Sequence, residues 1–430
     1  MGIIKKGIFF LLLGLICIPS FQEEFNSFNI KPLRGFFESA PLPEFSDSSW
    51  FNGAYQINYQ KHINDSIGFR PFLVRLYNQI DFSFFSIPHA ERVVVGKKGE
   101  LFATGYIRGY LGQDFLGEKL IDEKVRMLKV IQDVLWKTRK IFLFVLIPPD
   151  KGSYCPERIP DRFLKMQRKQ TGRDYFTMKA AEEGVNVLDF NPWFRQMKDT
   201  TKYALFPTTG VHWTDYGSWL AADSATRYIK AKTGINMPKL VMTGIEISQQ
   251  PRHNDDDINK TMNLIWDAPH VSLAYPQFRV DYDPIISKPS CLFIGDSFFW
   301  GWWDQGIIDT LFSNKEFWYY NKEIFPESFT KVKTTSEINL KDAVERQNIV
   351  VLFQVGAGGG DPGTGFIETA YAEFDTSSGN KIREIEQKIK SSSNWLEAVK
   401  KKAIERKIPL EEMVRIDAIG LFTDALKNQK

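Results

Sequence analysis

The first apolar run of the chain lies at its N-terminus and has no polar face. Lys5 and Lys6 precede it, and the run extends from Gly7 to about Phe21. A basic segment followed by an apolar one is typical of an export signal. No small-x-small cleavage site follows, so we expect residues 1–22 to be a signal anchor, or a signal peptide released after cleavage. Because the basic residues stay on the cytoplasmic side, everything after residue 22 is predicted to lie on the far side of the membrane.

Residues 23–84 are predicted to form an N-terminal extension that ends in a helix. Residues 23–60 contain several Pro, Ser and Phe without sustained periodicity, which favours an extended segment. Apolar residues then recur at three- and four-residue spacing, as one buried helix face requires. These residues are Phe69, Phe72, Leu73, Leu76, Tyr77 and Ile80.

Strand and helix patterns alternate over residues 85–376. Residues 92–102 have the pattern of a hairpin, and the apolar runs 141–147, 291–294 and 349–353 predict buried parallel strands. Helical patterns separate these strands, and the alternation predicts an α/β fold with a doubly wound parallel sheet. Residues 234–290 are rich in Pro, Asp and Asn and are expected to be an irregular insertion. Residues 377–430 are charged and predicted to be C-terminal helices.

Composition narrows the classes of function. The 430 residues carry a net charge of only +3, which is too balanced for a nucleic-acid-binding surface. The 5 His residues lack the close spacing of a zinc site, so neither a metal nor a cofactor is predicted. The 3 cysteines predict no disulfide framework, although a bridge between Cys155 and Cys291 stays open.

The strongest candidate for chemistry is Ser297. It stands in the segment Ile294-Gly295-Asp296-Ser297-Phe298, directly after a buried strand, where a tight Gly turn can present a nucleophilic hydroxyl. The backbone N–H groups of Ser297 and Phe298 are the natural oxyanion donors if a helix starts there. A polar turn that merely caps the next helix is the alternative interpretation.

Serine needs a base, and His212 is the candidate. It precedes Trp213 at a predicted loop-to-helix junction, where an imidazole can project into a cleft. An imidazole has the pKa required to take a serine proton at neutral pH. The alternative is a histidine that only packs.

Aromatic and polar residues near these two are candidates for substrate binding. Trp213, Trp300 and Trp303 are close in sequence to His212 or Ser297, and aromatic faces stack on sugar rings. Packing within the core is the rival explanation. Lys151 and Tyr154 follow a predicted strand and are candidates for binding an anionic sugar, with a solvated loop as the alternative.

The His-Trp segment followed by a later Gly-Asp-Ser resembles the SGNH-hydrolase-like proteins of alginate O-acetylation, the AlgJ and AlgX type. Further matching pieces occur between about residue 60 and residue 375, namely Asn64–Arg70, Val93–Phe102 and Ile147–Lys151 with Tyr154 and Pro160. The resemblance implies an SGNH-like acyltransferase domain over residues 85–376. It also implies a periplasmic protein, held at the inner membrane by its N-terminal segment, that passes acetyl groups from a membrane-bound acyltransferase to a polysaccharide.

One position departs from this family pattern. The acid of the family stands two residues before the histidine, where this chain has Gly210. Loss of the equivalent acid in serine proteases lowers the rate by about four orders of magnitude. Three replacements are open: Asp215, Asp189, or a backbone carbonyl that orients the ring. Asp215 is equally explained as a first-turn acid favoured by the helix dipole.

Three functions therefore follow from the sequence. The leading hypothesis is an O-acetyltransferase in which His212 deprotonates Ser297 and an acyl-serine intermediate acetylates a cell-surface polysaccharide or exopolysaccharide, such as alginate. The second is a polysaccharide-binding scaffold protein of an acetylation complex, with impaired catalysis because of Gly210. The third is a carbohydrate acetyl esterase that uses the same pair of residues with water as acceptor.

Overall fold

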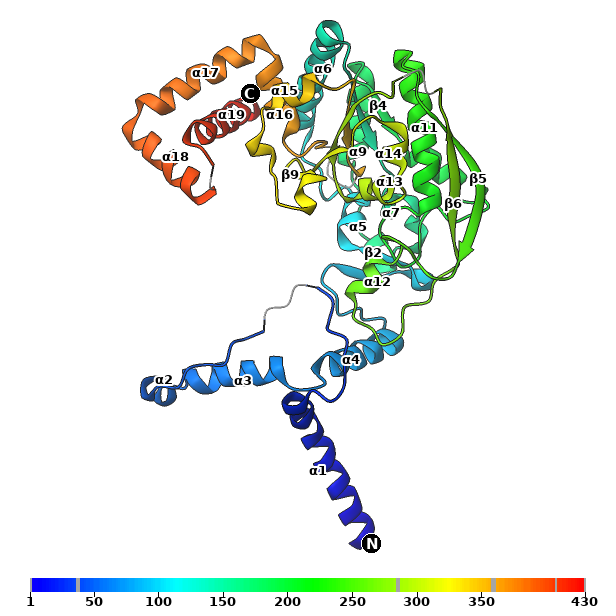
Figure 1. The fold of residues 1–430 in the computed structure, drawn as a ribbon, viewed down its shortest axis with the longest axis vertical. Coiled ribbons are helices and arrows are strands. Elements are labelled where there is room, and N and C mark those ends of the chain that lie inside the picture. The colour runs from blue at the N-terminus through cyan, green and yellow to red at the C-terminus, as the bar shows by residue number, and fades with distance from the viewer. Residues whose placement is uncertain (1, 36–38, 284–286, 357–360, 407, 429–430) are drawn as a thin grey trace. The chain divides into compact units, whose positions relative to one another are not determined.

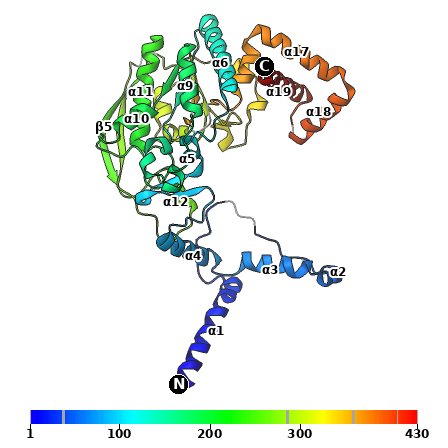
Figure 2. The ribbon, with the colours of Figure 1, turned by 180° about the vertical axis from the view of Figure 1, so that it is seen from behind.

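A computed structural model describes the chain except at residues 1, 36–38, 284–286, 357–360, 407 and 429–430. The described residues form two compact units, one of residues 1–95 and 257–269 and the other of residues 96–256 and 270–430. Figure 1 and Figure 2 show the helices and strands of both units from opposite sides. Ser297 and His212 both belong to the second unit.

The first unit is mainly helical. Its elements are α1 (Gly2–Phe25), α2 (Asp47–Phe51), α3 (Ala54–Ser66), α4 (Arg70–Phe85), β1 (Val93–Val95) and α12 (Asp257–Thr261). Helix α1 has 24 residues and is long and apolar enough to cross a membrane, with none of its apolar window buried. This agrees with an N-terminal segment that acts as a signal or an anchor.

Helix α4 forms where the sequence predicts a helix, but the prediction that its apolar face is buried is wrong. Five of the six apolar residues of that face are 37–58% exposed. The residues that α4 buries are Asn78 and Gln79 instead. The five exposed residues are Phe72, Leu73, Leu76, Tyr77 and Ile80.

A six-stranded sheet organises the second unit. Its strands are β3 (Phe142–Ile147), β4 (Val187–Asp189), β7 (Cys291–Gly295), β8 (Glu316–Tyr319), β9 (Glu323–Phe325) and β10 (Ile349–Phe353). They follow the order β4-β3-β10-β7-β8-β9, and every neighbouring pair is parallel except β8 and β9. The predicted α/β fold with a mostly parallel central sheet is therefore confirmed.

Helices surround this sheet (Figure 1). They are α5 (Thr104–Tyr110), α6 (Glu118–Arg139), α7 (Lys151–Tyr154), α8 (Asp161–Leu164), α9 (Gly172–Glu182), α10 (Asn191–Met197), α11 (Asp215–Thr233), α13 (Trp300–Asp304), α14 (Ile307–Leu311), α15 (Leu340–Glu345) and α16 (Phe366–Phe374). Short strand β2 (Leu101–Ala103) precedes α5.

The central strands bury both of their faces, because successive side chains of a strand point to opposite sides of the sheet. In β3, Leu143 and Val145 belong to one apolar core together with residues of α6 and α16. Phe142 and Phe144 belong to a second core together with residues of α11 and α13. This double burial explains why the strands are continuous apolar runs rather than alternating ones.

The segment predicted to be an irregular insertion contains a long antiparallel ribbon. Strand β5 (Lys239–Ser248) pairs with β6 (Leu273–Asp281), and the register shifts between Met242 and Gly244. Such a bulge adds one residue to one strand and so reverses its alternation. The alternating pattern is therefore interrupted within β5, which is why the sequence concealed the strand.

The C-terminal residues form the predicted helices, α17 (Thr376–Ser391), α18 (Ser393–Arg406) and α19 (Leu410–Asn428). Their buried apolar residues extend the core that contains α6. Ile382 and Ile389 of α17 and Met413 and Val414 of α19 belong to it. The C-terminal segment is thus packed onto the sheet unit rather than separate from it.

Candidate active site

Ser297 follows β7 at the carboxyl end of a central strand, where sites of parallel sheets form. Gly295 ends that strand, and a Cβ at this position would lie 1.9 Å from the Phe353 carbonyl oxygen of β10. Only glycine fits such a close approach. The Asp296 N–H donates to the same carbonyl at 3.1 Å. Ser297 then begins the 3-10 turn η3 (Ser297–Phe299).

The Asp296 carboxylate fixes the conformation of this turn. It accepts the N–H of Phe298 at 3.0 Å and the N–H of Val355 at 2.7 Å. Burial raises the pKa of Asp296 to about 6, while these two bonds and the nearby His212 oppose the rise. Asp296 therefore ties the serine turn to the end of β10.

His212 lies beside Ser297, although 85 residues separate them in sequence. Its Nε2 is 2.9 Å from the Ser297 Oγ. The next residues hold it there: Thr214 caps helix α11 by accepting the Gly217 N–H at 3.1 Å, and its own hydroxyl donates to the Ala204 carbonyl at 2.8 Å. This contact has the geometry of a nucleophile and its general base.

Asp215 does not serve His212 in this structure, which corrects its predicted role as the acid. Its Oδ2 is 2.9 Å and its Oδ1 is 3.2 Å from the Nδ1 of His253. That hydrogen bond raises the pKa of His253, against the effect of burial. Asp215 is thus both the first acid of α11, as the alternative interpretation expected, and the partner of a histidine that the sequence did not single out.

The space of the missing acid is filled by backbone. A Cβ at Gly210 would lie 2.7 Å from the Asp255 carbonyl oxygen and 2.9 Å from that of Asn254. The Thr209 hydroxyl also donates to the Asp255 carbonyl at 3.3 Å. Gly210 therefore lets an acidic segment of the chain pack directly against the loop that leads to His212.

Lys151 holds that loop from the other side, and this corrects its prediction as a substrate-binding residue. Its side chain is 0% exposed, so no polymer can reach it. The ammonium donates to the carbonyl oxygens of Pro207, Thr208 and Gly210 at 2.7, 3.0 and 2.7 Å. It also pairs with Glu100 at 2.8 Å. Lys151 is therefore a buried clamp on the segment that precedes His212.

Tyr154 also packs against the protein itself. Its ring lies 4.8 Å from the ring of Phe206, and burial is the main reason that its pKa is raised. The Lys198 ammonium lies 5.5 Å over the Tyr154 ring. These contacts occupy the ring on two sides and favour a role in packing over one in sugar binding.

Trp213 is a core residue, which corrects its prediction as a sugar-stacking surface. It is only 3% exposed and stacks on Trp302 with ring centroids 6.4 Å apart. Trp300 and Trp303 are half-buried and lie 5.5 Å from each other. Both also contact Phe329, which is 63% exposed. Trp300 and Trp303 follow Ser297 closely in the sequence and, unlike Trp213, are partly exposed to solvent.

Of the two predicted oxyanion donors, the backbone N–H groups of Ser297 and Phe298, the second already has an acceptor within the protein. The Phe298 N–H is already bound to Asp296 and is not directed at a substrate. A residue that the sequence did not reveal, Tyr320, lies near Ser297: burial raises the pKa of Tyr320 to about 12, and its interaction with the Ser297 side chain opposes that rise. Tyr320 follows β8 with a left-handed backbone (φ 50°), a strained conformation for a bulky residue and one common at functional sites. Its N–H donates to the Gly295 carbonyl at 2.7 Å.

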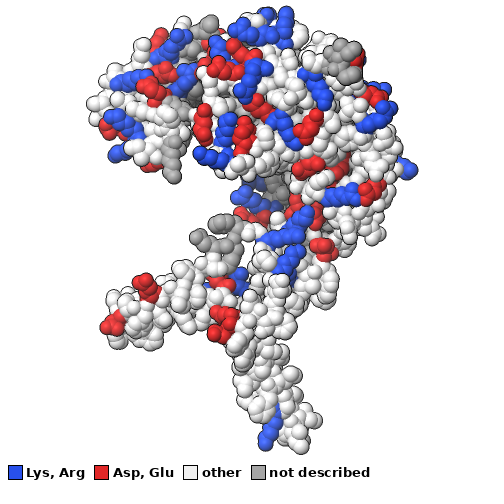
Figure 3. All heavy atoms as spheres, in the orientation of Figure 1, with Lys and Arg blue, Asp and Glu red and all other residues white. Residues whose placement is uncertain are grey.

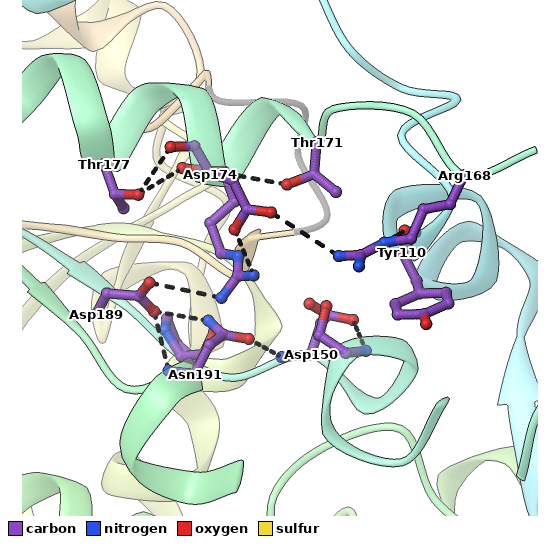
Figure 4. A network of polar contacts seen from close by, with 11 residues as sticks. Tyr110, Asp150, Arg168, Thr171, Asp174, Thr177, Asp189 and Asn191 are labelled. Atoms are coloured by element: carbon purple, nitrogen blue, oxygen red, sulfur yellow. Dashed lines mark hydrogen bonds and ion pairs between the residues drawn. The ribbon is translucent and has the colours of Figure 1, made fainter. Parts of the chain in front are cut away.

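Asp189, the second acid considered for His212, belongs to a separate network (Figure 4). Its carboxylate accepts the Asn191 side-chain amide at 2.7 Å and pairs with Arg173 at 3.5 Å. The Asn191 side chain in turn accepts the Asp150 N–H at 3.2 Å. This network ties together the ends of β3 and β4 and leaves Asp189 engaged away from the histidine.

The structure offers little for a metal or a disulfide. Among the described residues, no group of three or more His, Cys, Asp or Glu side chains is placed to hold a metal ion. Cys155 and Cys291 are both buried free thiols, so the bridge that stayed open is not formed. The chemistry available at this edge of the sheet is that of Ser297 and His212.

Comparison with known proteins finds a family model that matches part of the chain. Residues 93–290 match the family model ALGX, described as the SGNH hydrolase-like domain of acetyltransferase AlgX. No curated protein matches the chain. The matched segment contains His212, Lys151 and Gly210 and ends just before β7, so Ser297 is placed by the structure alone.

Several solved structures resemble the chain at low sequence identity. The O-acetyltransferase domain of Pseudomonas putida AlgJ is 17% identical, with a TM-score of 0.42 over 65% of this chain and 99% of that chain. Pseudomonas aeruginosa AlgX is 15% identical, with a TM-score of 0.43 over 66% of each chain. Bacillus cereus PatB1 is 11% identical, with a TM-score of 0.34 over 56% of this chain and 90% of that chain.

The family model is the comparison that carries weight, because it rests on the sequence of the segment itself. It agrees with the resemblance found in the motifs and with the α/β sheet of the second unit. Residues 93–290 of this chain therefore match, in sequence, the family model of SGNH hydrolase-like domains of the acetyltransferase AlgX.

Proposed function

We propose that this protein is an O-acetyltransferase that carries acetyl on Ser297. The observation that supports it most directly is the 2.9 Å contact between His212 Nε2 and Ser297 Oγ in a chain with an acetyltransferase-family segment. A serine hydroxyl is a weak nucleophile until a base in contact with it accepts its proton. His212 provides that base.

The reaction proceeds in two half-reactions. In the first, His212 takes the Ser297 proton while Oγ attacks the acetyl carbonyl of the donor, and the leaving group departs with that proton. In the second, His212 takes the proton of an acceptor hydroxyl, whose oxygen attacks the acetyl-serine ester. Ser297 leaves as its alkoxide and recovers the proton from His212. Each half-reaction passes through an oxyanion that needs donors.

The acid of the triad is proposed to come from Asp255 or Asp256, which belong to the same unit as His212. The backbone of Asp255 packs against Thr209 and Gly210, which stand three and two residues before His212. Asp255 itself is buried and accepts the Tyr275 hydroxyl at 2.8 Å. Separate Asp→Asn variants at these two positions identify the acid: the variant that slows acylation of Ser297 by orders of magnitude marks it.

The acceptor and the location are proposed from the family resemblance and from α1. The acceptor is a cell-surface or exopolysaccharide hydroxyl, alginate-like in chemistry, and the donor is a membrane-bound acyltransferase. Helix α1, long and apolar enough to span a bilayer, supports a periplasmic protein held at the inner membrane. The half-buried rings of Trp300 and Trp303 remain candidates for stacking on the sugar.

Intact-mass measurement after incubation with p-nitrophenyl acetate tests the acyl-serine. The wild type is expected to gain one acetyl group, which peptide mapping assigns to Ser297. Ser297→Ala should lose the adduct, and His212→Ala should form it far more slowly. His270→Ala, a histidine outside this site, is the matched control. An adduct that persists in Ser297→Ala overturns the proposal. Partition of product between water and an oligosaccharide acceptor then separates a transferase from an esterase.

A second function is favoured by one observation, Gly210 in the place of the family acid. It is that of a polysaccharide-binding scaffold protein with impaired catalysis in an acetylation complex. Robust turnover by the wild type excludes it. Binding of the oligosaccharide without any acetyl adduct supports it.

A further inference from the structure

The surface of the first unit contains an apolar stripe that the described residues of this unit do not cover. On α4, residues 72, 73, 76, 77, 80 and 84 recur at helical spacing and lie on one side of the helix. Their exposure runs from 37% at Leu76 to 78% at Phe84. A soluble helix normally turns such a stripe inward, so this orientation requires cover from outside the unit.

Hydrogen bonds fix this orientation. The Asn78 amide donates to the Met262 carbonyl at 2.9 Å, and the Gln79 side chain accepts the Trp266 N–H at 3.0 Å. Both side chains are buried against the 257–269 segment of the same unit. Rotating α4 to bury its stripe would expose these bonds, so the polar face is the internal one.

A second exposed apolar surface lies on α2 and α3. The rings of Phe45, Trp50, Tyr55 and Tyr59 contact one another, and Tyr55 and Tyr59 stack with centroids 5.6 Å apart. Phe45 is 62% exposed and Trp50 is 46% exposed. Tyr and Trp of this kind are the residues enriched where proteins meet the headgroup region of a bilayer.

Both surfaces lie after α1 in the chain and belong to the same unit as α1. At 1.5 Å per residue, the 24 residues of α1 reach about 36 Å, enough for the roughly 30 Å hydrocarbon core of a bilayer. The face visible in Figure 3 carries few charged side chains over α1 and α3. A bilayer that α1 spans is thus the apolar phase closest in sequence to the exposed surfaces.

We propose that the stripe of α4 and the aromatic surface of α2 and α3 lie in the interface of the membrane that α1 spans. The apolar rings enter the headgroup region, and the polar face with Asn78 and Gln79 stays on the protein side. This role is independent of the chemistry at Ser297. This contact holds the helices of the first unit against the bilayer surface, so that α1 is not the unit's only attachment to the membrane.

Apolar insertion, rather than attraction to anionic lipid, drives the contact. Arg75 donates to the carbonyls of Lys31 and Pro32, each at 2.7 Å, and Arg70 pairs with Asp65 at 3.3 Å. These basic groups of α4 are engaged within the unit. Membrane contact of the stripe should therefore be the same in neutral phosphatidylcholine vesicles and in vesicles with added phosphatidylglycerol.

Fluorescence quenching in proteoliposomes tests the proposal. The full chain with Cys17→Ser is labelled with an environment-sensitive fluorophore at Leu76→Cys or Phe84→Cys, the other two cysteines being buried. Nitroxide-labelled lipids should quench both positions. Lys137→Cys on α6, whose native side chain is 75% exposed, is the matched control and should keep its fluorescence. Tyr77→Cys replaces Leu76→Cys if circular dichroism shows that variant to be unfolded.

Wild type labelled at Cys17 reports whether α1 is in the bilayer. Quenching at Cys17 together with an unquenched stripe overturns the proposal. So does an unquenched Cys17, because the stripe then has no membrane beside it. Quenching of the stripe only after a membrane protein is added assigns the surface to a protein partner and also overturns it.

Discussion

The substitution Lys151→Met removes the ammonium that clamps the loop before His212 and keeps an unbranched apolar stem of four heavy atoms. The ammonium is fully buried and bonds to Glu100 and to three carbonyl oxygens. Methionine removes this donor from the Pro207 and Gly210 carbonyls, whereas the Thr208 carbonyl keeps the Leu101 N–H at 2.9 Å. It also leaves Glu100, whose side chain is 17% exposed, without its cation. Removing one partner of a buried ion pair costs about 3–5 kcal/mol.

Such a loss is a large part of the roughly 5–15 kcal/mol that stabilises a folded domain. Urea unfolding followed by circular dichroism should therefore show a much lower midpoint. Acylation of Ser297 by p-nitrophenyl acetate should also be slower at urea concentrations well below the unfolding midpoint, because the loop that positions His212 is no longer held. The apparent affinity for an anionic oligosaccharide should not change in the fraction that stays folded, since Lys151 cannot reach it.

Two further variants make the result decisive. Lys137→Met removes an exposed lysine from α6 and should change stability by less than about 0.5 kcal/mol. The double variant Lys151→Met, Glu100→Gln should recover part of the loss, because it removes the orphaned charge. A single Lys151→Met that unfolds at the same urea concentration as Lys137→Met would refute the reasoning.

Three other outcomes follow from the site. Gly210→Asp, which restores the family acid, should lower both stability and acylation, because its Cβ meets the Asp255 carbonyl at 2.7 Å; a gain in acylation rate would contradict this. Burial raises the pKa of Asp255 to about 7, so the folded state keeps a proton that the unfolded state loses near pH 4. The stability contribution of Asp255 should fall as pH rises from about 4 to about 7, and urea midpoints against pH should be flatter in Asp255→Asn. Tyr320→Phe should slow acylation by on the order of 10²-fold if its hydroxyl is an oxyanion donor, with Tyr319→Phe as control; equal single-turnover rates would exclude that role.

The local pattern was enough to predict the central strands and to single out Ser297 and His212, which the structure brings into contact. The fully apolar runs of β3, β7 and β10 identify strands buried on both faces. The Gly-Asp-Ser turn after β7 places a serine at the carboxyl edge of the sheet. His212 was recognisable because it stands at the start of a helix beside Trp213.

Side-chain contacts between residues far apart in the chain could not be predicted from the sequence. Asp215 is close to His212 in the chain, yet it bonds His253, 38 residues away, because the segment before the acidic run folds back onto α11. Lys151 follows a strand, as a surface residue often does, yet its side chain is buried and its ammonium has four acceptors. Spacing along the chain does not encode either contact.

The sequence by itself determined which segments are apolar and how they repeat, since periodicity reflects the geometry of a single element. Only the tertiary structure decided which face of each element is covered. The α4 stripe has the spacing of a buried face, yet Asn78 and Gln79 take the inner side because their hydrogen-bond partners lie there. Likewise, only the tertiary structure explains the glycine at position 210, because the backbone of Asp255 packs where a Cβ would lie.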